Sequence, residues 1–232
     1  MSEISIVIPA YNEESNILDT IKRVRKSLSS HDYEIIVVDD GSKDNTFNAV
    51  KKSRLTNVKC YRLNKNSGKG AAFRFGIKKS VGKITVQIDA DSQFLPEEIP
   101  KILKPFEKDD TDVVLASRFC KGAYIESGSV SFRNRIGNYG ASLLTSFACL
   151  KRVTDIQAGF KAFKTEHLKK IDFKENRFGY EPEVVILASK MGLKIKEIPI
   201  TYKKRRKGQS NIKFIQDAIN ISKTIFRTAF FS

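Results

Sequence analysis

The sequence contains few of the residues that build zinc centres or disulfide frameworks. Among its 232 residues are two histidines and three cysteines, and the cysteines are widely spaced without a C-x-x-C pair. Because cysteine and histidine form no cluster, the pattern argues against a zinc centre. An odd number of scattered cysteines favours reduced thiols and a cytoplasmic setting.

Long apolar runs and linkers that would divide domains are also missing. No run approaches the length that spans a bilayer, and residues 4–8 begin a strand so early that we expect no signal peptide. The sequence has no internal repeat, no low-complexity tract and no linker rich in proline or glycine. We therefore expect one domain, or one domain with a C-terminal extension.

Positive charge is abundant. The 42 lysines and arginines outnumber the 26 aspartates and glutamates, which gives a formal net charge of +16. A surplus of this size favours polyanionic partners, namely nucleic acid, an anionic membrane surface or phosphorylated substrates. A generally lysine-rich proteome is the alternative explanation. With 41% hydrophobic and 29% charged residues, the composition is that of a folded domain.

Short β-branched runs alternate with segments of helical spacing through the first half of the chain. The strand-like runs cover residues 4–8, 34–38, 58–63, 84–88 and 113–116. The helix-like segments cover residues 13–28, 44–53, 70–80 and 96–106. This alternation predicts an α/β fold with a doubly wound, mostly parallel central sheet. Such sheets bind ligands at the carboxyl ends of their strands.

Beyond residue 117 the pattern is looser. It predicts a loop at 119–131, helices at 132–150 and 181–191, a strand at 195–202, a basic turn at 203–208 and an amphipathic tail at 211–231. The helix at 132–150 and the tail are apolar on one face and basic at the edges. Each of them either rests at a lipid interface or packs on the sheet as ordinary core.

The most informative stretch is the acidic pair Asp89 and Asp91, which directly follows the apolar run at residues 84–88. Carboxylates one residue apart at the end of a buried strand make a hard oxygen site, which suits Mg²⁺ or Mn²⁺ holding a diphosphate. Such a site is typical of a transferase that uses a nucleotide sugar. An acidic strand-to-loop turn is the alternative reading.

Further motifs accompany this pair in a fixed order, at residues 4–14, 37–44, 66–72, 117–119, 155–160, 178–181 and 205–210. Together with the acidic pair they resemble family 2 inverting glycosyltransferases, and within that family the dolichyl- or polyprenyl-phosphate mannose and glucose synthases. The resemblance implies a GT-A type nucleotide-diphospho-sugar transferase fold. Residues 1–210 would form the catalytic domain and residues 211–232 a C-terminal amphipathic helix. The Q-x-x-R-W motif of processive polysaccharide synthases is absent from the sequence, which favours transfer of a single sugar.

The same resemblance implies roles for individual residues. The nucleotide-sugar site would comprise Pro9, Ala10, Tyr11, Glu13, Val38, Asp39, Asp40, Lys69, Asp89, Ala90, Asp91, Gln93 and Arg205. Asp91 and Gln93 would be the leading ligands of Mg²⁺ or Mn²⁺, with Asp89 as a further ligand or a sugar contact. The catalytic residues would be Asp89, Asp91, Asp155 and Arg205.

Residue chemistry supports these roles and leaves alternatives open. A guanidinium binds diphosphate oxygens bidentately, so Arg205 is preferred for the leaving group, although Arg206 competes and a solvated basic loop is the alternative. Asp39 and Asp40 serve either the nucleoside or the capping of a loop and helix. Lys69, in a glycine-flanked turn that opens a helix, serves an anion or is an ordinary solvated lysine.

On the acceptor side, the resemblance assigns the phosphate to Arg118, Arg133 and Arg135. A lipid monophosphate is already largely ionised near neutral pH, since its second pKa is about 6. It therefore needs positioning and charge balance more than a strong base. On this view Asp155 orients an arginine or the sugar rather than removing a proton. A structural salt bridge is the alternative role for Asp155.

The implied function is a metal-dependent, inverting transfer of one hexose from a nucleotide sugar to dolichyl or polyprenyl phosphate. GDP-mannose is slightly favoured over UDP-glucose, although Ser92 departs from the residue usual in mannose synthases. We expect a cytoplasmic protein, peripheral at the inner face of a membrane.

Other classes of function remain to be weighed. A family 2 transferase acting on a non-lipid hydroxyl would need a true base. An inactive binding protein is disfavoured because both acidic residues of the motif are present. A nucleic-acid-binding module would interleave aromatic with basic residues, and residues 203–207 contain no aromatic residue, so nucleic acid is not an expected partner.

Overall fold

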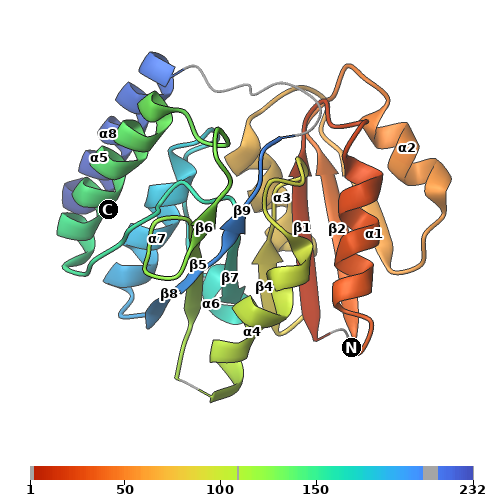
Figure 1. Cartoon of the computed structure of the whole chain (residues 1–232), viewed down its shortest axis with the longest axis horizontal. Coiled ribbons are helices and arrows are strands. Elements are labelled where there is room, and N and C mark those ends of the chain that lie inside the picture. Colours follow the sequence, from red (N-terminus) through yellow and green to blue (C-terminus); the bar gives the residue numbers. More distant parts are fainter. Residues whose placement is uncertain (1–2, 109, 206–213, 232) are drawn as a thin grey trace.

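A seven-stranded, mostly parallel sheet with helices on both faces forms the centre of the structure (Figure 1). The computed structural model describes residues 3–108, 110–205 and 214–231. From one edge to the other, the strands are β3 (Val58–Arg62), β2 (Tyr33–Asp39), β1 (Ile4–Ala10), β4 (Ile84–Gln87), β7 (Lys161–Lys164), β5 (Val113–Ser117) and β8 (Ile195–Pro199). A separate two-stranded sheet pairs β6 (Tyr124–Ile125) with β9 (Thr201–Tyr202).

The helices divide between the two faces of the large sheet. One face is covered by α1 (Ile17–Ser27), α2 (Thr46–Ser53) and α4 (Ile99–Lys108), the last preceded by the short 3₁₀ helix η1 (Pro96–Glu98). The other face is covered by α3 (Lys69–Lys79), α5 (Phe132–Cys149), α6 (Thr165–Leu168), α7 (Tyr180–Lys190) and α8 (Phe214–Phe231). The α/β fold with a mostly parallel sheet is therefore confirmed.

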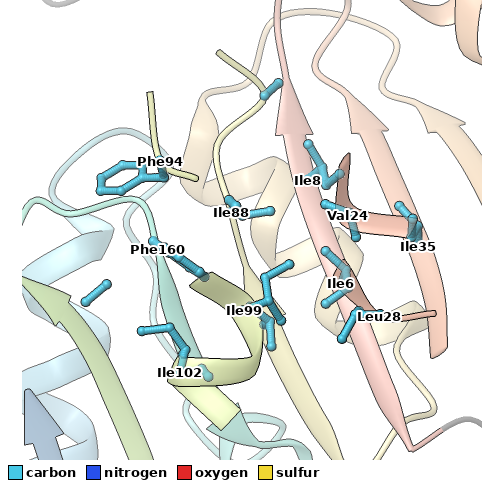
Figure 2. Close-up of a cluster of buried hydrophobic side chains, with 14 of the residues drawn as sticks. Ile6, Ile8, Val24, Leu28, Ile35, Ile88, Phe94, Ile99, Ile102 and Phe160 are labelled. Carbon is cyan, nitrogen blue, oxygen red and sulfur yellow. The ribbon is translucent and has the colours of Figure 1, made fainter. Parts of the chain in front are cut away.

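Two hydrophobic cores, one on each face, hold these layers together. Along β1, Ile6 and Ile8 belong to one core and Val7 to the other, because successive side chains of a strand point to opposite faces. Figure 2 shows the first core, where Val24 and Leu28 lie against the side chains of β1. Burial on both faces explains why the strands read as continuous apolar runs in the sequence.

In the first half of the chain the observed elements lie close to the predicted ones, with one displacement. The first helix begins at Ile17 rather than at residue 13. The residues between them form a turn that is tied to the start of α2, where the backbone N–H of Glu13 donates to Oγ1 of Thr46 at 2.9 Å. The turn leaves Glu13 at the carboxyl end of β1, where it lines a cavity.

The second half differs from the prediction in four places. The short strand β6 lies inside the loop predicted at 119–131, and the one-turn helix α6 was not predicted. The sequence analysis predicts no strand at residues 161–164, yet β7 lies antiparallel between β4 and β5. This strand is short and has a lysine at each end, so its apolar pattern is weak. The single strand predicted at 195–202 is two strands separated by Ile200, because β8 pairs with β5 whereas β9 pairs with β6. The tail helix is present from Phe214, and residues 211–213 lie outside the described residues.

The topology brings the loops that carry the predicted site residues together at the carboxyl ends of the parallel strands. β1 pairs in parallel with β2 and with β4, so the carboxyl ends of all three strands meet there. α5 and α8 pack side by side near the same end of the sheet (Figure 1). In the described ranges, no helix combines the length and the apolar character needed to cross a membrane.

Candidate active site

A cavity of about 840 Å³ lies at the carboxyl ends of β1 and β4 and is also lined by residues of α5 and α8. Twelve of the residues singled out in the sequence line it: Pro9, Ala10, Tyr11, Glu13, Asp40, Lys69, Asp89, Ala90, Asp91, Gln93, Arg118 and Arg205. Five do not line it. Val38, Asp39 and Asp155 are fully buried, whereas Arg133 and Arg135 are exposed on α5. Arg206, the competitor of Arg205, lies outside the described residues.

The acidic pair forms one wall of the cavity, and each carboxylate is held by a basic side chain. Nζ of Lys69 lies 2.7 Å from Oδ1 of Asp89. Nη2 of Arg205 lies 2.5 Å from Oδ2 of Asp91, and its Nη1 lies 3.1 Å from Oε1 of Glu13. Burial raises the pKa of Asp89 to about 6, against the lowering effect of Lys69. The wall thus gathers carboxylates that need cations nearby to remain ionised.

Asp89, Asp91 and Gln93, which all line the cavity, bring together oxygen donors that suit a hard divalent cation. Arg205 bridges Glu13 and Asp91, so the site already accommodates positive charge between two carboxylates. The backbone N–H of Gln93 donates to Oδ1 of Asp91 at 3.1 Å, which fixes the carboxylate on the turn. Within the described ranges, no group of three or more histidine, cysteine, aspartate or glutamate side chains is arranged to hold a metal by itself. A site with few protein ligands fits an ion that also takes oxygens from a bound phosphate.

The two carboxylates after β2 shape the loops around the cavity. Asp40 accepts the backbone N–H groups of Ser67 and Gly68, both at 2.8 Å, and so fixes the loop that leads into α3. Asp39 is fully buried and pairs with Nε of Arg62 at 3.2 Å. Both carboxylates therefore fix loops, since Asp39 also accepts the backbone N–H of Ser42 at 3.2 Å, and Asp40 in addition lines the cavity.

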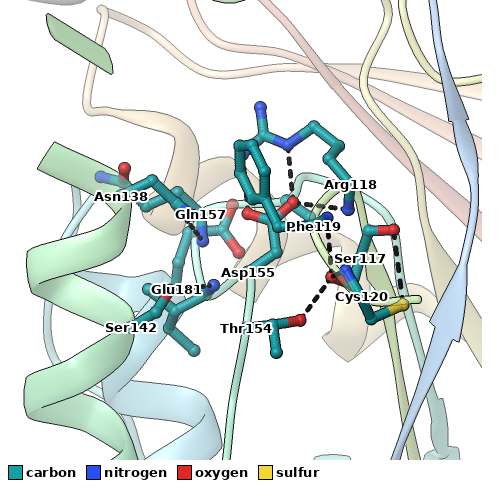
Figure 3. Close-up of polar contacts among 12 residues, drawn as sticks. Ser117, Arg118, Phe119, Cys120, Asn138, Ser142, Thr154, Asp155, Gln157 and Glu181 are labelled. Atoms are coloured by element: carbon teal, nitrogen blue, oxygen red, sulfur yellow. Dashed lines mark hydrogen bonds and ion pairs between the residues drawn. The ribbon is translucent and has the colours of Figure 1, made fainter. Parts of the chain in front are cut away.

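Arg118 and Asp155 form the second charged feature of the site, shown in Figure 3. Two guanidinium nitrogens and the backbone N–H of Arg118 donate to the carboxylate of Asp155, which is fully buried. The guanidinium also lies 4.9 Å from the ring centre of Tyr202 and 5.4 Å from that of Phe119. Although burial alone would lower it, Asp155 raises the pKa of Arg118, which remains charged.

The other two predicted phosphate ligands lie on the first turns of α5. The guanidinium of Arg135 lies 5.8 Å from the ring of Phe119, the same ring that Arg118 contacts. The structure thus links Arg135 to Arg118 through one aromatic side chain. Arg133 is exposed beside them on the same helix.

Three residues without a role in the sequence analysis stand close to the acidic wall. Glu181 lines the cavity and accepts a hydrogen bond from Lys69. The buried Lys161 donates to the other carboxylate oxygen of Glu181, and Gly159 lies directly against Asp89. A Cβ atom on Gly159 would lie 2.0 Å from Oδ2 of Asp89. The sequence contains one signal for Lys161, namely its place as a lysine within the otherwise apolar residues 158–163.

α5 and α8 expose an unusual amount of apolar surface. Twelve of the fifteen exposed large apolar side chains among the described residues lie on these helices or at the end of α5: Phe132, Ile136, Tyr139, Leu143, Leu144, Phe147, Leu150, Ile215, Ile219, Phe226, Phe230 and Phe231. The opposite side of α8 packs on the core through Ile221 and Ile225. Both readings of these helices, core packing and an exposed apolar face, therefore apply to different sides of the same elements.

The chain is similar to known proteins both in sequence and in structure. The family model described as Glycosyl transferase family 2 matches residues 5–172. The chain is 32% identical to the dolichol-phosphate mannosyltransferase of Pyrococcus furiosus over 91% of this chain, and it spans 59% of that protein's length. It is 35% identical to the UDP-N-acetylglucosamine dolichyl-phosphate N-acetylglucosaminyltransferase of Methanococcus voltae, over 85% of this chain and 84% of that protein.

Among solved structures, the chain is similar to glucosyl-3-phosphoglycerate synthase from Mycobacterium tuberculosis in complex with Mn²⁺, UDP and glucosyl-3-phosphoglycerate. The TM-score is 0.75 at 20% identity, covering 98% of this chain and 80% of that chain. This likeness confirms the GT-A type fold that the sequence predicts.

Proposed function

The chain belongs to glycosyl transferase family 2 and is a glycosyltransferase, and on that premise we propose that it transfers one hexose from a nucleotide sugar to a dolichyl or polyprenyl phosphate, with inversion. The observation that carries the proposal is one cavity lined by both the acidic pair and Arg118. A single in-line displacement brings a leaving diphosphate and an anionic nucleophile together in one cavity.

On the donor side, we assign a divalent cation to Asp89, Asp91 and Gln93. When bound, Mg²⁺ or Mn²⁺ would neutralise charge on the departing nucleoside diphosphate. The mycobacterial synthase, described in complex with Mn²⁺ and UDP, supports this assignment. Arg205 would bind the diphosphate oxygens, since its guanidinium lies at the acidic wall and binds phosphate bidentately.

On the acceptor side, we assign the phosphate to Arg118, with Arg133 and Arg135 nearby on α5. Asp155 would hold Arg118 in place rather than act as a base, because Arg118 donates to both of its carboxylate oxygens. An ionised phosphate is already a competent nucleophile near neutral pH, and it requires orientation more than deprotonation.

The exposed apolar faces of α5 and α8 would contact the acceptor's lipid chain and the membrane. α5 and α8 both line the cavity and both carry exposed large apolar side chains. Exposed basic residues lie on the same helices, among them Arg133, Arg135 and Lys223. Apolar faces with basic edges bind anionic lipid surfaces. We therefore propose a peripheral protein that docks through α5 and α8 at the inner, cytoplasmic face of a membrane.

For the donor we propose GDP-mannose, with UDP-glucose as the alternative. The mannosyltransferase of Pyrococcus furiosus supports mannose as the sugar, because it is 32% identical over 91% of this chain. The relative from Methanococcus voltae uses UDP-N-acetylglucosamine by its name, so that donor belongs in the same test.

A radiolabel assay tests the proposal directly. GDP-mannose, UDP-glucose and UDP-N-acetylglucosamine are each offered with a short polyprenyl phosphate, with Mn²⁺, with Mg²⁺ or with EDTA. We expect one donor to give label in the organic phase and EDTA to abolish the transfer. Label that stays in the aqueous phase with a sugar or peptide hydroxyl acceptor would instead support the second candidate, a transferase acting on a non-lipid hydroxyl.

A further inference from the structure

A row of alternating charges runs from the interior of the sheet to the acidic wall of the cavity. Lys161 on β7 bonds Oε2 of Glu181, the second residue of α7. Oε1 of Glu181 accepts from Nζ of Lys69 at 3.0 Å. The same Nζ lies 2.7 Å from Oδ1 of Asp89. Two lysines and two carboxylates, from β7, α7, α3 and the segment that follows β4, therefore form one connected row in which positive and negative charges balance.

Lys161 is an unusual residue for its position. It is 1% exposed, does not line the cavity, and lies on a central strand among the buried residues Phe160, Ala162 and Phe163. Its ammonium also donates to the backbone oxygen of Ala158 at 2.5 Å. Desolvation of a buried ion pair commonly offsets its Coulomb attraction, so added stability alone does not explain a lysine here.

Glu181 is held in one orientation by its neighbours. The hydroxyl of Tyr180 donates to Oε1 at 2.7 Å, and Nε2 of Gln87 lies 2.6 Å from the Tyr180 oxygen. Since Lys161 occupies Oε2, Lys69 meets only the remaining oxygen and is shared with Asp89. Without Lys161, both oxygens of Glu181 would attract Lys69 away from the cavity.

From this arrangement, and resting on the donor site of the proposed function, we propose that Lys161 is a positioning residue for the donor diphosphate. It acts through Glu181 and holds the ammonium of Lys69 at the acidic wall, where Lys69 contacts a phosphate oxygen of the nucleotide. Lys161 itself touches neither substrate.

The first experiment compares Lys161→Met with Lys164→Met. Lys164 lies on the same strand but pairs with Asp112 at 2.9 Å and does not line the cavity, so it is a matched control. Binding of GDP and of UDP, each with Mn²⁺, is measured by calorimetry, and KM is measured for donor and acceptor separately. We expect Lys161→Met to weaken nucleotide binding and raise the donor KM by about tenfold, within the range for residues of one ion-pair network. The acceptor KM and the control should be unchanged.

The second experiment tests whether Lys161 acts through Lys69. In a Lys69→Met background, we expect Lys161→Met to cause no further loss of nucleotide binding, because the side chain that it positions is gone. A further loss of similar size in that background would overturn the relay, as would an unchanged donor KM in the single variant. A purely structural role would lower the melting temperature in both backgrounds and move the two KM values together.

If Lys161→Met does not fold, a double variant in which both buried charges are replaced by neutral side chains is used instead. Lys161→Met combined with Glu181→Gln removes both buried charges, a change that proteins often tolerate. We expect this double variant to fold and to bind nucleotide no more weakly than Glu181→Gln alone, because Lys161 acts through Glu181, and a further loss in the double variant would overturn the inference. If the wild-type protein binds neither nucleotide, the proposed function and this inference both fail. Wild-type binding with an unaffected Lys161→Met variant refutes the relay alone.

Discussion

Arg118 and Asp155 form a two-pronged ion pair, with Nε to Oδ2 at 2.6 Å and Nη2 to Oδ1 at 2.7 Å, and the backbone N–H of Arg118 adds a third bond at 2.9 Å. Asp155 has no exposed surface, so neither oxygen is available to take a proton from an acceptor. The pair is better suited to holding a cation at the cavity than to base catalysis. This geometry agrees with a nucleophile that arrives already ionised.

We accordingly expect Asp155→Asn to retain more activity than Asp91→Asn. Loss of Asp91 removes charge at the site of the leaving diphosphate and should lower kcat/KM by about 10²- to 10³-fold. Asp155→Asn leaves a hydrogen-bonding partner for Arg118 and should lower kcat/KM by about tenfold, mainly through the acceptor KM. Steady-state kinetics with each substrate varied in turn measures both effects. The reverse order, or a steep alkaline rise in rate that depends on Asp155, would indicate a true base and a hydroxyl acceptor.

Gly159→Ala should disable the site while the fold persists. The added methyl group would lie 2.0 Å from Oδ2 of Asp89, so the carboxylate must turn away from the cavity. We expect nucleotide-dependent activity to fall about 10²-fold, because displacement of a positioned group by about 1 Å has that effect. In an Asp89→Ala background the clash is absent, so adding Gly159→Ala should leave the melting temperature unchanged. If Gly159→Ala lowers the melting temperature as much in that background as in the wild-type protein, the clash with Asp89 is not the cause of the decrease.

Arg205 should compete with a divalent cation for Asp91, which its guanidinium links to Glu13. In the structure its guanidinium bridges these carboxylates, 2.5 Å from one and 3.1 Å from the other. Arg205→Ala should therefore bind Mn²⁺ more tightly without nucleotide, by about tenfold, while transfer activity falls because the diphosphate loses its guanidinium. Electron paramagnetic resonance of free Mn²⁺ measures the affinity. Arg23→Ala, which breaks a surface pair with Glu97, is the control and should change neither quantity. Unchanged Mn²⁺ affinity in Arg205→Ala would contradict the competition.

The parts of the fold that the sequence predicted are those that local patterns encode. Continuous β-branched runs marked β1, β2 and β4, and the acidic pair stands at the end of β4 as expected. β7 escaped prediction because four residues bounded by lysines carry little pattern. Its antiparallel place between β4 and β5 depends on pairing with distant strands, which no local window contains.

The candidate site shows the same division. Asp89, Asp91 and Arg205 were identified from residue type and order, and all three line the cavity. Lys69 was identified in the same way, but its partner Glu181 was not, because the two residues meet across a separation of 112 residues. A motif indicates which side chains can act chemically. The ion pairs that orient those side chains form only when α3, α7 and the segment after β4 pack together.

The cysteines should be unreactive in the folded protein. Burial, with a smaller contribution from Asp39, raises the pKa of Cys60 to about 12, and burial also raises the pKa of Cys120 and of Cys149. A raised thiol pKa lowers the thiolate fraction, to about one in ten thousand for Cys60 at pH 8. Reaction with a disulfide reagent at pH 8 should therefore be far slower in native protein than in urea, and should speed up as pH rises. One thiol reacting natively at the rate of free cysteine would contradict this expectation.

The exposed faces of α5 and α8 give a last prediction, on the membrane. Phe226 and Phe230 are 60% and 69% exposed, and their rings lie 4.9 Å apart on α8. Insertion of each ring into a lipid interface would bury apolar area worth about 1.5–3 kcal/mol per side chain. Phe226→Ser with Phe230→Ser should thus weaken co-sedimentation with vesicles of phosphatidylglycerol and phosphatidylcholine by at least about tenfold.

Val81→Ser is the matched control for that experiment, because Val81 is 59% exposed but lies between α3 and β4, away from these helices. It should leave vesicle binding unchanged. Raised salt should weaken binding of the wild-type protein, since the basic residues on α5 and α8 then contribute less. The catalytic rate with a short, water-soluble polyprenyl phosphate should survive the double Phe substitution, because neither ring lines the cavity. If the double variant and wild type bind vesicles equally, these rings do not enter the lipid, and docking through α8 is wrong.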